Sequence, residues 1–323
     1  MTIDFKDRVA IVTGAGGGLG REYALELAAR GAKVVVNDFG GARDGSGGSA
    51  TAAEQVVAEI ESKGGTAVPN PASVTDFPAV EAMVADTLSR WGRVDVLINN
   101  AGVLRDKSFA KMTLDDFRFV LDVHLMGSVN CTKAVWDAMR EAGYGRILMT
   151  SSSTGLYGNF GQANYGAAKL GLVGLMKTLA IEGAKSNIHV NSIFPVAGTR
   201  MTEDIMPDEM LKLLAPKNVV PAALYLVSNA APTSTILGAG AGGFHAAHVT
   251  LTHGIMVPEA ERTVETVAAR IAEITDQFAG TDAFVRYAVC ANGAIIYDAE
   301  HDRVLWSANL EPDVHSTRSC SAS

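Results

Sequence analysis

The sequence predicts a doubly wound α/β fold, in which a parallel β-sheet is covered by helices on both faces. Short apolar runs alternate with amphipathic stretches of a dozen or more residues, which is the spacing of repeated βαβ units. The apolar runs are continuous, as expected of strands that are buried on both faces. The first run also ends in a glycine-rich turn that opens the first helix.

The order of the elements follows from these runs. The first strand, RVAIVT at residues 8–13, leads into a helix at residues 19–30, which Gly31 can end. Further strands are expected at residues 33–38, 66–69, 94–98, 146–150 and 188–194. Further helices are expected at residues 51–63, 78–91, 113–140 and 162–185.

Three regions depart from this alternation. Residues 39–49, FGGARDGSGGS, are polar and glycine-rich, which predicts a flexible connector, and they lack the Lys-Ser/Thr ending of a P-loop. Residues 258–278 predict one amphipathic helix that begins at Pro258. Strand-like runs around the Asn-Gly pair at residues 292–293 predict a hairpin, to which the sequence assigns no function.

Composition excludes several classes of protein. The net charge of −8 disfavours nucleic acid as the main partner, because phosphate binding needs a basic surface. No apolar run approaches the length of a membrane span, so no membrane partner is expected. Cys131, Cys290 and Cys320 are widely spaced, which indicates reduced thiols of an intracellular protein. The first strand begins too early for a signal peptide, and the final CSAS is not a peroxisomal address, so the expected compartment is the cytoplasm.

Three histidines within residues 236–257 raise the question of a metal site. His245, His248 and His253 have no carboxylate or cysteine placed with them in a ligand pattern. We therefore expect no metal and interpret them as ordinary polar residues of a loop or strand.

The turn TGAGGGLG at residues 13–20 predicts a dinucleotide site. Gly14, Gly18 and Gly20 allow the tight turn, the close approach of a pyrophosphate and close helix–strand packing. Asp38 closes the next strand, where its carboxylate can accept hydrogen bonds from the adenosine ribose hydroxyls and would repel a 2′-phosphate. No Lys or Arg lies within the glycine turn, so NAD is favoured over NADP. NNAG, at residues 99–102, follows the fourth strand on the ligand-binding edge of the sheet.

Ser152, Tyr165 and Lys169 form the candidate catalytic group. The four-residue step from Tyr165 to Lys169 puts both side chains on one helix face. An ammonium one turn away favours phenolate, and we expect it to lower the pKa of Tyr165 toward the range of a general acid/base. Ser152 follows an apolar strand and can hydrogen-bond the substrate oxygen. An isolated YxxxK pattern would more simply be part of an ordinary amphipathic helix. The catalytic hypothesis therefore depends on a nicotinamide-binding site elsewhere in the sequence.

TGAGGGLG, Asp38, NNAG, Ser152 and YGAAK together resemble the short-chain dehydrogenase/reductase superfamily, over residues 6–230. The resemblance implies a Rossmann fold with about seven parallel strands, assembled as a homodimer or homotetramer. It implies that Tyr165 is the acid/base, that Lys169 holds the nicotinamide ribose and tunes Tyr165, and that Ser152 orients the substrate oxygen. The implied cofactor contacts are Gly14, Gly18, Leu19, Gly20, Asp38, Ser73, Val74, Asn100, Ala101, Gly102, Tyr165, Lys169, Pro195, Val196 and Thr199.

The narrower resemblance concerns His124, which stands where most members of the superfamily have the Asn of a proton relay. VHLMGS, VNDFGG and NNAGVLRDKSFAKM are similar to the (3R)-hydroxyacyl-CoA dehydrogenase part of type-2 multifunctional β-oxidation enzymes. That subfamily also carries His here and includes enzymes that act on 17β-hydroxysteroids. The similarity implies a relay role for His124, and a buried structural His is the alternative. We expect residues 1–257 to form the catalytic domain, 258–280 a C-terminal helix and 281–323 a tail of unknown role.

The expected activity is the NAD-dependent oxidation of a secondary alcohol. The resemblance implies a (3R)-3-hydroxyacyl-CoA as the small-molecule substrate and 3-oxoacyl-CoA as the product. A 17β-hydroxysteroid, or a hydroxyacyl-CoA on a steroid side chain, is a close alternative, since both are hydrophobic secondary alcohols. A 3-oxoacyl-carrier-protein reductase is disfavoured by Asp38, because such reductases usually take NADPH. A non-catalytic NAD-binding protein would have no need of Ser152, Tyr165 and Lys169 together.

Overall fold

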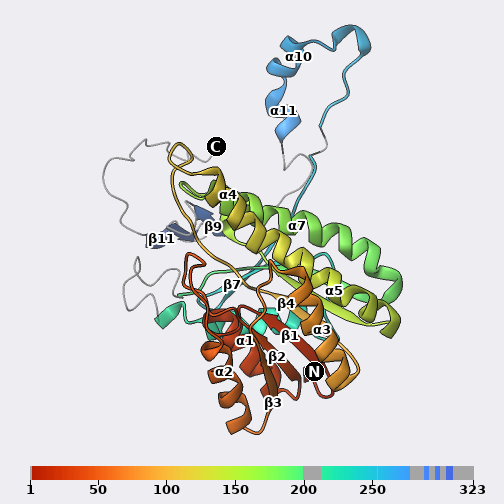
Figure 1. Cartoon of the computed structure of the whole chain (residues 1–323). Helices are drawn as coiled ribbons and strands as arrows, with labels where there is room; N and C mark the ends of the chain where they lie inside the picture. Colours follow the sequence, from red (N-terminus) through yellow and green to blue (C-terminus); the bar gives the residue numbers. More distant parts are fainter. Residues whose placement is uncertain are drawn as a thin grey trace. The chain divides into compact units, whose positions relative to one another are not determined.

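The computed structural model describes residues 2–198, 212–252 and 254–276, and the backbone of three strands beyond them. Backbone contacts divide the chain into two units, Met1–Ala247 and His248–Ser323, and each is described by itself (Figure 1). The first unit contains the glycine turn, Asp38, NNAG and the candidate catalytic residues Ser152, Tyr165, Lys169 and His124.

An eight-stranded sheet organises the first unit, with the strand order β3-β2-β1-β4-β5-β6-β7-β8. The first seven strands run parallel, and β8 adds an antiparallel edge. The bounds are β1 Val9–Thr13, β2 Lys33–Asn37, β3 Thr66–Asn70, β4 Val96–Asn99, β5 Gly145–Thr150, β6 Ile188–Pro195, β7 Ile236–Gly240 and β8 Gly243–Ala247. The doubly wound parallel sheet is thus confirmed, and its order reverses between β1 and β4, where ligands bind in such folds.

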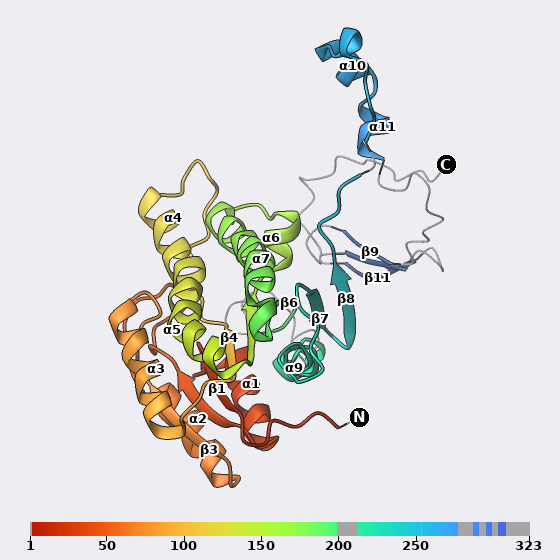
Figure 2. The ribbon, with the colours of Figure 1, turned by 90° about the vertical axis from the view of Figure 1, so that its right-hand side faces the viewer.

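The inner strands contribute alternate side chains to two separate cores. Ala10 and Val12 of β1 belong to one core and Ile11 to the other, because successive side chains of a strand point to opposite faces. The first core is covered by α1 (Gly18–Ala29), α2 (Thr51–Ser62) and α9 (Val220–Leu226). The second is covered by α3 (Phe77–Trp91), α5 (Gly127–Ala142) and α7 (Ala163–Gly183) (Figure 2). Burial on both faces explains why the strands are apolar throughout.

The ends of α3 illustrate how the local sequence sets helix boundaries. The Asp76 side chain accepts a hydrogen bond from the backbone N–H of Ala79 and so caps the first turn, with Pro78 just inside it. Gly92 ends the helix in the left-handed conformation at φ 74°, which glycine adopts without strain.

The predicted helix over residues 113–140 is three consecutive helical segments. These are α4 (Leu114–Leu121), the π-helical segment η1 (Asp122–Met126) and α5, which continue one another along one line (Figure 2). The Thr113 side chain caps α4 by accepting from the N–H of Asp116. The π-helical turn holds His124, and π-helical turns occur often at functional sites.

The glycine-rich insert at residues 39–49 contains no helix or strand, as predicted for a connector, and hydrogen bonds also tie it to the domain. Its backbone closes on itself through hydrogen bonds from Ser49 N–H to the Phe39 carbonyl and from Ala42 N–H to the Ser46 carbonyl. It also accepts a hydrogen bond from Leu104 N–H, at 3.0 Å on the Arg43 carbonyl. The partners come from the loop after β4, some sixty residues away, which the composition of the insert does not reveal.

The second unit corrects another prediction. In place of one helix over residues 258–278, the structure has η5 (Glu259–Glu261), α10 (Val264–Ala269) and α11 (Ile271–Thr275). The chain leaves helical geometry at Arg270, at φ −108° and ψ 15°, and no described residue of α10 or α11 is buried. Without a buried face, the amphipathic pattern alone does not sustain a long helix.

Beyond these helices, β9 (Tyr287–Cys290) pairs antiparallel with β10 (Ile295–Asp298), which confirms the hairpin; β10 pairs with β11 (Arg303–Ser307). The Asn-Gly pair itself lies outside the described residues. No described helix is long and apolar enough to cross a membrane. In the described part of the chain, no three His, Cys, Asp or Glu residues are grouped to hold a metal ion.

Candidate active site

The glycine turn between β1 and α1 leaves no room for side chains. Gly14 and Gly18 adopt φ angles of 63° and 53°, the left-handed region that glycine favours. A Cβ atom on Gly16 would lie 2.8 Å from Asp38 Oδ2, and one on Gly20 would collide with the Gly14 carbonyl oxygen. Leu19 packs against the core of the first sheet face. The turn therefore presents bare backbone at the amino end of α1, where anions bind.

Asp38 lies directly beside this turn. Its two carboxylate oxygens accept hydrogen bonds, each 2.7 Å long, from the N–H groups of Gly16 and Gly40. The carboxylate thus ties the glycine turn to the start of the glycine-rich insert. Each oxygen keeps a further lone pair, so the group can still accept from a ligand.

NNAG meets the glycine turn through Thr13, a residue that the sequence argument did not assign. Thr13 Oγ1 accepts hydrogen bonds from the N–H groups of Asn100 and Ala101, at 3.0 and 3.1 Å. The Asn100 amide donates to the carbonyls of Thr13 and Gly14, and a Cβ on Gly14 would lie 2.8 Å from Ala101 Cα. Asn100 therefore holds the two turns together. The sequence could have indicated this role, because Thr13 is the first residue of TGAGGGLG.

The remaining cofactor candidates lie around the same edge of the sheet. Val74 is buried after β3, and its carbonyl accepts from the Asn130 amide at 2.9 Å; Ser73 Oγ lies 2.8 Å from Thr75 Oγ1. Pro195 ends β6, and the N–H of Val196 donates to the Ala239 carbonyl at 2.8 Å. The prediction for Thr199 lies outside the described residues.

Ser152 and Tyr165 are brought together by the packing of two helices. Ser152 caps α6 (Ser153–Tyr157), its Oγ accepting from the Thr154 N–H at 3.1 Å, and its hydroxyl hydrogen-bonds the Tyr165 phenol. A Cβ on Gly155 would lie 2.8 Å from Lys169 Cβ, so glycine permits the close approach of α6 to α7. Ser152 and Tyr165, thirteen residues apart, therefore form one hydrogen-bonded pair.

Lys169 is buried beneath this pair. Its Nζ donates to the Thr150 carbonyl at 2.6 Å and lies 5.4 Å from the centre of the Tyr165 ring. Ser151 Oγ donates to the Lys169 carbonyl at 2.8 Å, which fastens α7 to the end of β5. Burial lowers the pKa of the Lys169 amine to about 7, because the protein interior disfavours its charged form.

The expected direction of the Tyr165 pKa was wrong. Burial of the phenol raises the pKa of Tyr165 to about 12, and the hydrogen bond from Ser152 opposes that rise without reversing it. We expected a permanent ammonium at Lys169 to dominate, but the same burial favours the neutral amine. Desolvation is therefore the largest cause of the pKa shift of both groups.

His124 lies against Tyr165 from the π-helical segment. The two rings are edge to face, with centroids 5.1 Å apart, and the imidazole is buried. Its Nε2 lies 2.8 Å from the Val103 carbonyl, and its Nδ1 has no hydrogen-bond partner within the described part of the chain. Burial, followed by the nearby Lys169 charge, holds the pKa of His124 well below its usual value, so the ring is neutral at neutral pH. A Cβ on Gly102 would collide with this ring, which links NNAG to His124.

Asn164 is a second residue that the sequence argument missed. Its side chain is fully buried, accepts from the Tyr165 N–H at 2.8 Å and donates to the Arg105 carbonyl at 3.1 Å. It therefore ties the start of α7 to the loop after NNAG. Its place beside Tyr165 was a weak signal, because a polar residue in the first turn of a helix is common.

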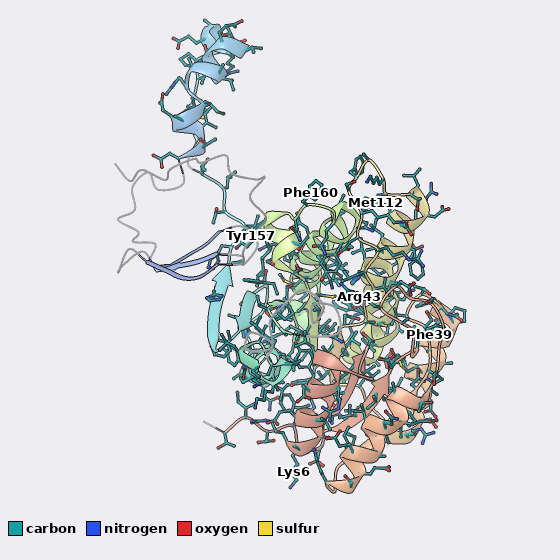
Figure 3. All side chains as sticks on the ribbon, turned by 90° about the vertical axis from the view of Figure 1, so that its left-hand side faces the viewer. Lys6, Phe39, Arg43, Met112, Tyr157 and Phe160 are labelled. Carbon is teal, nitrogen blue, oxygen red and sulfur yellow. The ribbon has the colours of Figure 1, made fainter. Side chains whose placement is uncertain are left out.

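Exposed apolar side chains surround this end of the domain. Tyr157 and Phe160 are 69% and 89% exposed, and Phe109 and Leu114 are 75% and 69% exposed. In Figure 3, Tyr157, Phe160 and Met112 lie at the same end of the first unit, and Arg43 of the insert lies lower in this view. Such a rim is suited to a hydrophobic ligand.

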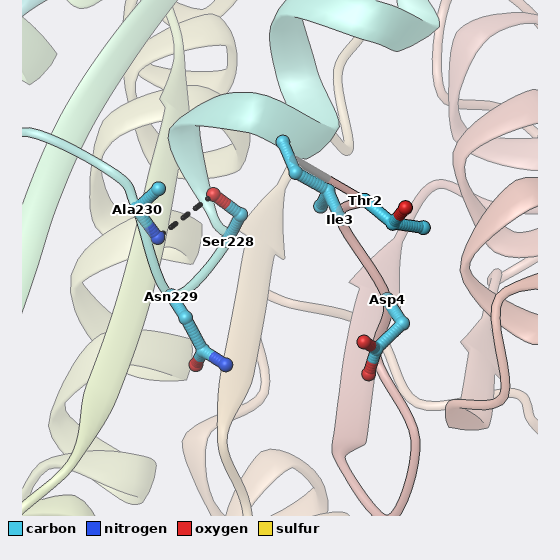
Figure 4. Close-up of a pocket in the computed structure, with 6 residues that line it drawn as sticks. All are labelled: Thr2, Ile3, Asp4, Ser228, Asn229 and Ala230. Carbon is cyan, nitrogen blue, oxygen red and sulfur yellow. Dashed lines mark hydrogen bonds between the residues drawn. The ribbon is translucent and has the colours of Figure 1, made fainter.

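One surface pocket lies elsewhere, lined by Thr2, Ile3, Asp4, Ser228, Asn229 and Ala230 (Figure 4). The Ser228 carbonyl accepts from Arg146, near the amino end of β5, whereas Ser152 follows the carboxyl end. The pocket therefore lies at the opposite end of the strand from the catalytic candidates. Among the lining residues described, Asp4 is the only acidic one. The pocket is not part of the candidate active site.

Comparisons with known proteins show which family this chain resembles. The family model described as short chain dehydrogenase matches residues 8–210. A short-chain type dehydrogenase/reductase of Mycobacterium tuberculosis is 49% identical, over 84% of this chain and 95% of that protein. The peroxisomal multifunctional enzyme type 2 of Mus musculus is 55% identical over 69% of this chain.

The chain spans only 30% of the length of that mouse enzyme. Among solved structures, a 7α-hydroxysteroid dehydrogenase complexed with NADH and 7-oxo glycochenodeoxycholic acid is 31% identical, with a TM-score of 0.67. That match covers 74% of this chain and 95% of the other. The fold is therefore shared with dehydrogenases of this family.

Proposed function

The chain belongs to the short-chain dehydrogenase family, and from that premise we propose that it oxidises a (3R)-3-hydroxyacyl-CoA to the 3-oxoacyl-CoA with NAD. The observation that carries the proposal is the Ser152–Tyr165 hydrogen bond above buried Lys169, at the sheet edge where the glycine turn opens α1. The similarity to multifunctional enzyme type 2 supports the substrate class. The exposed apolar rim around Phe160 suits an acyl chain.

The residues present fit a dinucleotide. The glycine turn is a backbone cradle that side chains would fill, and Asp38 keeps acceptor lone pairs beside it. The pyrophosphate would lie against Gly14, Gly18 and Gly20 at the start of α1, and the adenosine ribose against Asp38. NAD, when bound, supplies the acceptor for the hydride. The other proposed contacts are Leu19, Ser73, Val74, Asn100, Ala101, Gly102, Pro195, Val196 and Thr199.

The chain's own residues handle the proton. Tyr165 accepts the hydroxyl proton of the substrate, and Ser152 hydrogen-bonds the oxygen as it becomes a carbonyl. Lys169 holds the nicotinamide ribose and favours the phenolate when it is protonated. Because the pKa of Tyr165 is raised, oxidation is expected to accelerate toward alkaline pH and reduction toward acid pH.

A panel of substrates tests this function. Purified enzyme with NAD would be given (3R)- and (3S)-hydroxyacyl-CoAs of several chain lengths, 17β-estradiol and a steroid side-chain CoA thioester, and NADH would be followed by absorbance. Preference for the (3R) thioesters is the expected result. Turnover of the sterols alone would contradict the proposed substrate and favour the steroid alternative, to which the similar 7α-hydroxysteroid dehydrogenase belongs by its substrate class.

The cofactor preference can be tested at Asp38. Asp38→Asn keeps an oxygen that can accept from Gly16 N–H but removes the charge that would repel a 2′-phosphate. We expect the ratio of kcat/KM with NAD to that with NADP to fall at least about tenfold, since like charges in contact cost several kcal/mol. Glu54→Gln, at an exposed carboxylate in the first turn of α2, is the matched control. An unchanged ratio in Asp38→Asn would remove the argument for NAD.

His124 is proposed to support Lys169 and Tyr165 as a neutral ring. Because its pKa is far below the usual value, His124→Ala should lower turnover by about tenfold at every pH between 6 and 9. His124→Asn, with the residue typical of the superfamily, should retain more activity than the Ala variant. Wild-type turnover in His124→Ala would leave the residue a structural role only.

Assembly and compartment complete the proposal. We propose a homodimer or homotetramer, to be measured by light scattering, where a monomer would contradict the expectation. We also propose the cytoplasm, although the mouse relative is named a peroxisomal enzyme. A fluorescent fusion of the full chain would distinguish the two compartments.

A further inference from the structure

The side chain of Gln162, one helical turn before Tyr165, hydrogen-bonds residues of several segments. Gln162 immediately precedes α7, and its amide nitrogen donates to Asp106 Oδ2 at 2.7 Å. Its amide oxygen accepts from Thr154 Oγ1 and from Asn159 Nδ2, each at 2.9 Å. One amide therefore joins the loop after NNAG, helix α6 and the start of α7, the three segments that meet at the candidate active site.

Backbone contacts hold the same segments in register. The N–H of Lys107 donates to the Gly161 carbonyl at 2.9 Å, and Asn164 donates to the Arg105 carbonyl while it accepts from the Tyr165 N–H. The loop that carries Asp106 is thus fastened to the turn that carries Tyr165. Movement of either segment would break several hydrogen bonds together.

Asp106 acts on Tyr165 electrostatically as well as through Gln162. The residue is exposed, yet the surrounding protein removes enough water from its carboxyl to raise its pKa. Its negative charge contributes to the raised pKa of Tyr165. The other charged or titratable groups that face the two residues are Lys169 and His124 beside Tyr165, and Arg43 beside Asp106. Arg105 and Lys107 pair with Asp116.

On the basis of the proposed function, we propose that Asp106 and Gln162 are positioning residues for the reaction. The hydrogen bonds of Gln162 hold Ser152 and Tyr165 within reach of each other, and Asp106, which accepts one of these bonds, places a negative charge where it disfavours the phenolate of Tyr165. Neither residue needs to touch the reacting atoms for this effect.

Asp106→Asn removes the negative charge of Asp106 but keeps an oxygen that can accept the hydrogen bond from Gln162. The new amide oxygen can accept from Gln162 as the carboxylate does, while the negative charge is lost. Without that charge the phenolate is less disfavoured, so the alkaline rise of kcat/KM for oxidation should move toward acid by about half a pH unit. Asp137→Asn, at an exposed residue of α5, makes the same change of net charge and should leave the profile unchanged.

Salt distinguishes a charge effect from a structural one. Because Asp106 is exposed, the shift between wild type and Asp106→Asn should almost disappear in about 1 M salt, where the Debye length is ~3 Å. A shift of equal size at low and high salt would overturn the electrostatic part of the proposal, as would identical pH profiles. Absence of turnover in the wild type would instead refute the proposed function itself.

Gln162→Met tests whether the hydrogen bonds of Gln162 position Tyr165 and Ser152. The variant has a similar length but lacks the three hydrogen bonds, so kcat should fall by about tenfold through looser positioning of Tyr165 and Ser152, with NADH affinity unchanged. Thermal unfolding of the same variant reports whether it remains folded. Wild-type kcat in folded Gln162→Met would overturn the positioning role. An equal loss of kcat and of NADH affinity would show that Gln162 supports the overall structure and has no specific effect on Tyr165 and Ser152.

Discussion

Tyr165→Phe should lower the oxidation of the alcohol by about a thousandfold or more, because a positioned acid/base contributes ~10²–10⁴-fold to the rate. The change removes one oxygen from a phenol that hydrogen-bonds Ser152 and leaves the ring packed edge to face on His124. Binding of NADH, followed by fluorescence, should therefore survive, and kcat should carry the loss.

Two further variants make this result interpretable. Tyr225→Phe, on α9 and partly exposed, removes the same atom away from the site and should retain full turnover. Ser152→Ala should also lower kcat, since it removes the hydrogen bond that opposes the raised pKa of Tyr165. Near-normal turnover in Tyr165→Phe would refute the proposed mechanism, whereas loss of NADH binding in that variant would point to a disturbed site.

Lys169→Met should change the pH dependence of stability as well as activity. In the folded chain the pKa of Lys169 is lowered from 10.5 to about 7, because the buried site disfavours the ammonium. Below pH 7 the amine is protonated in both the folded and unfolded states, and the folded state bears the whole penalty. As the pH rises toward 10.5, the unfolded chain binds the extra proton, so the free energy of unfolding of the wild type increases.

The expected size follows from the pKa change. At ~1.36 kcal/mol per unit, the wild type should gain roughly 5 kcal/mol over Lys169→Met between acid and alkaline pH. Urea unfolding at several pH values measures this difference directly. Lys133→Met, at an exposed residue of α5, should run parallel to the wild type. A constant difference between wild type and Lys169→Met at all pH values would show that Lys169 does not carry a lowered pKa.

Local patterns in the sequence determined the sheet and the main motifs. RVAIVT and the later apolar runs predicted the strands because a strand buried on both faces must be apolar throughout. TGAGGGLG predicted a tight turn, and the structure places left-handed glycines at Gly14 and Gly18. The spacing of Tyr165 and Lys169 predicted a shared helix face. These features depend on residues that lie within a few positions of one another.

The tertiary structure alone decided the environment of these residues. The insert at residues 39–49 is anchored by partners near Leu104, and Gln162 meets Asp106 across a separation of 56 residues. The pKa of Tyr165 is raised rather than lowered because burial depends on how α6, α7 and the π-helical segment enclose it. Desolvation is set by the whole surroundings of a group, so spacing along the chain could identify Tyr165 and Lys169 but not the energy of their charged forms.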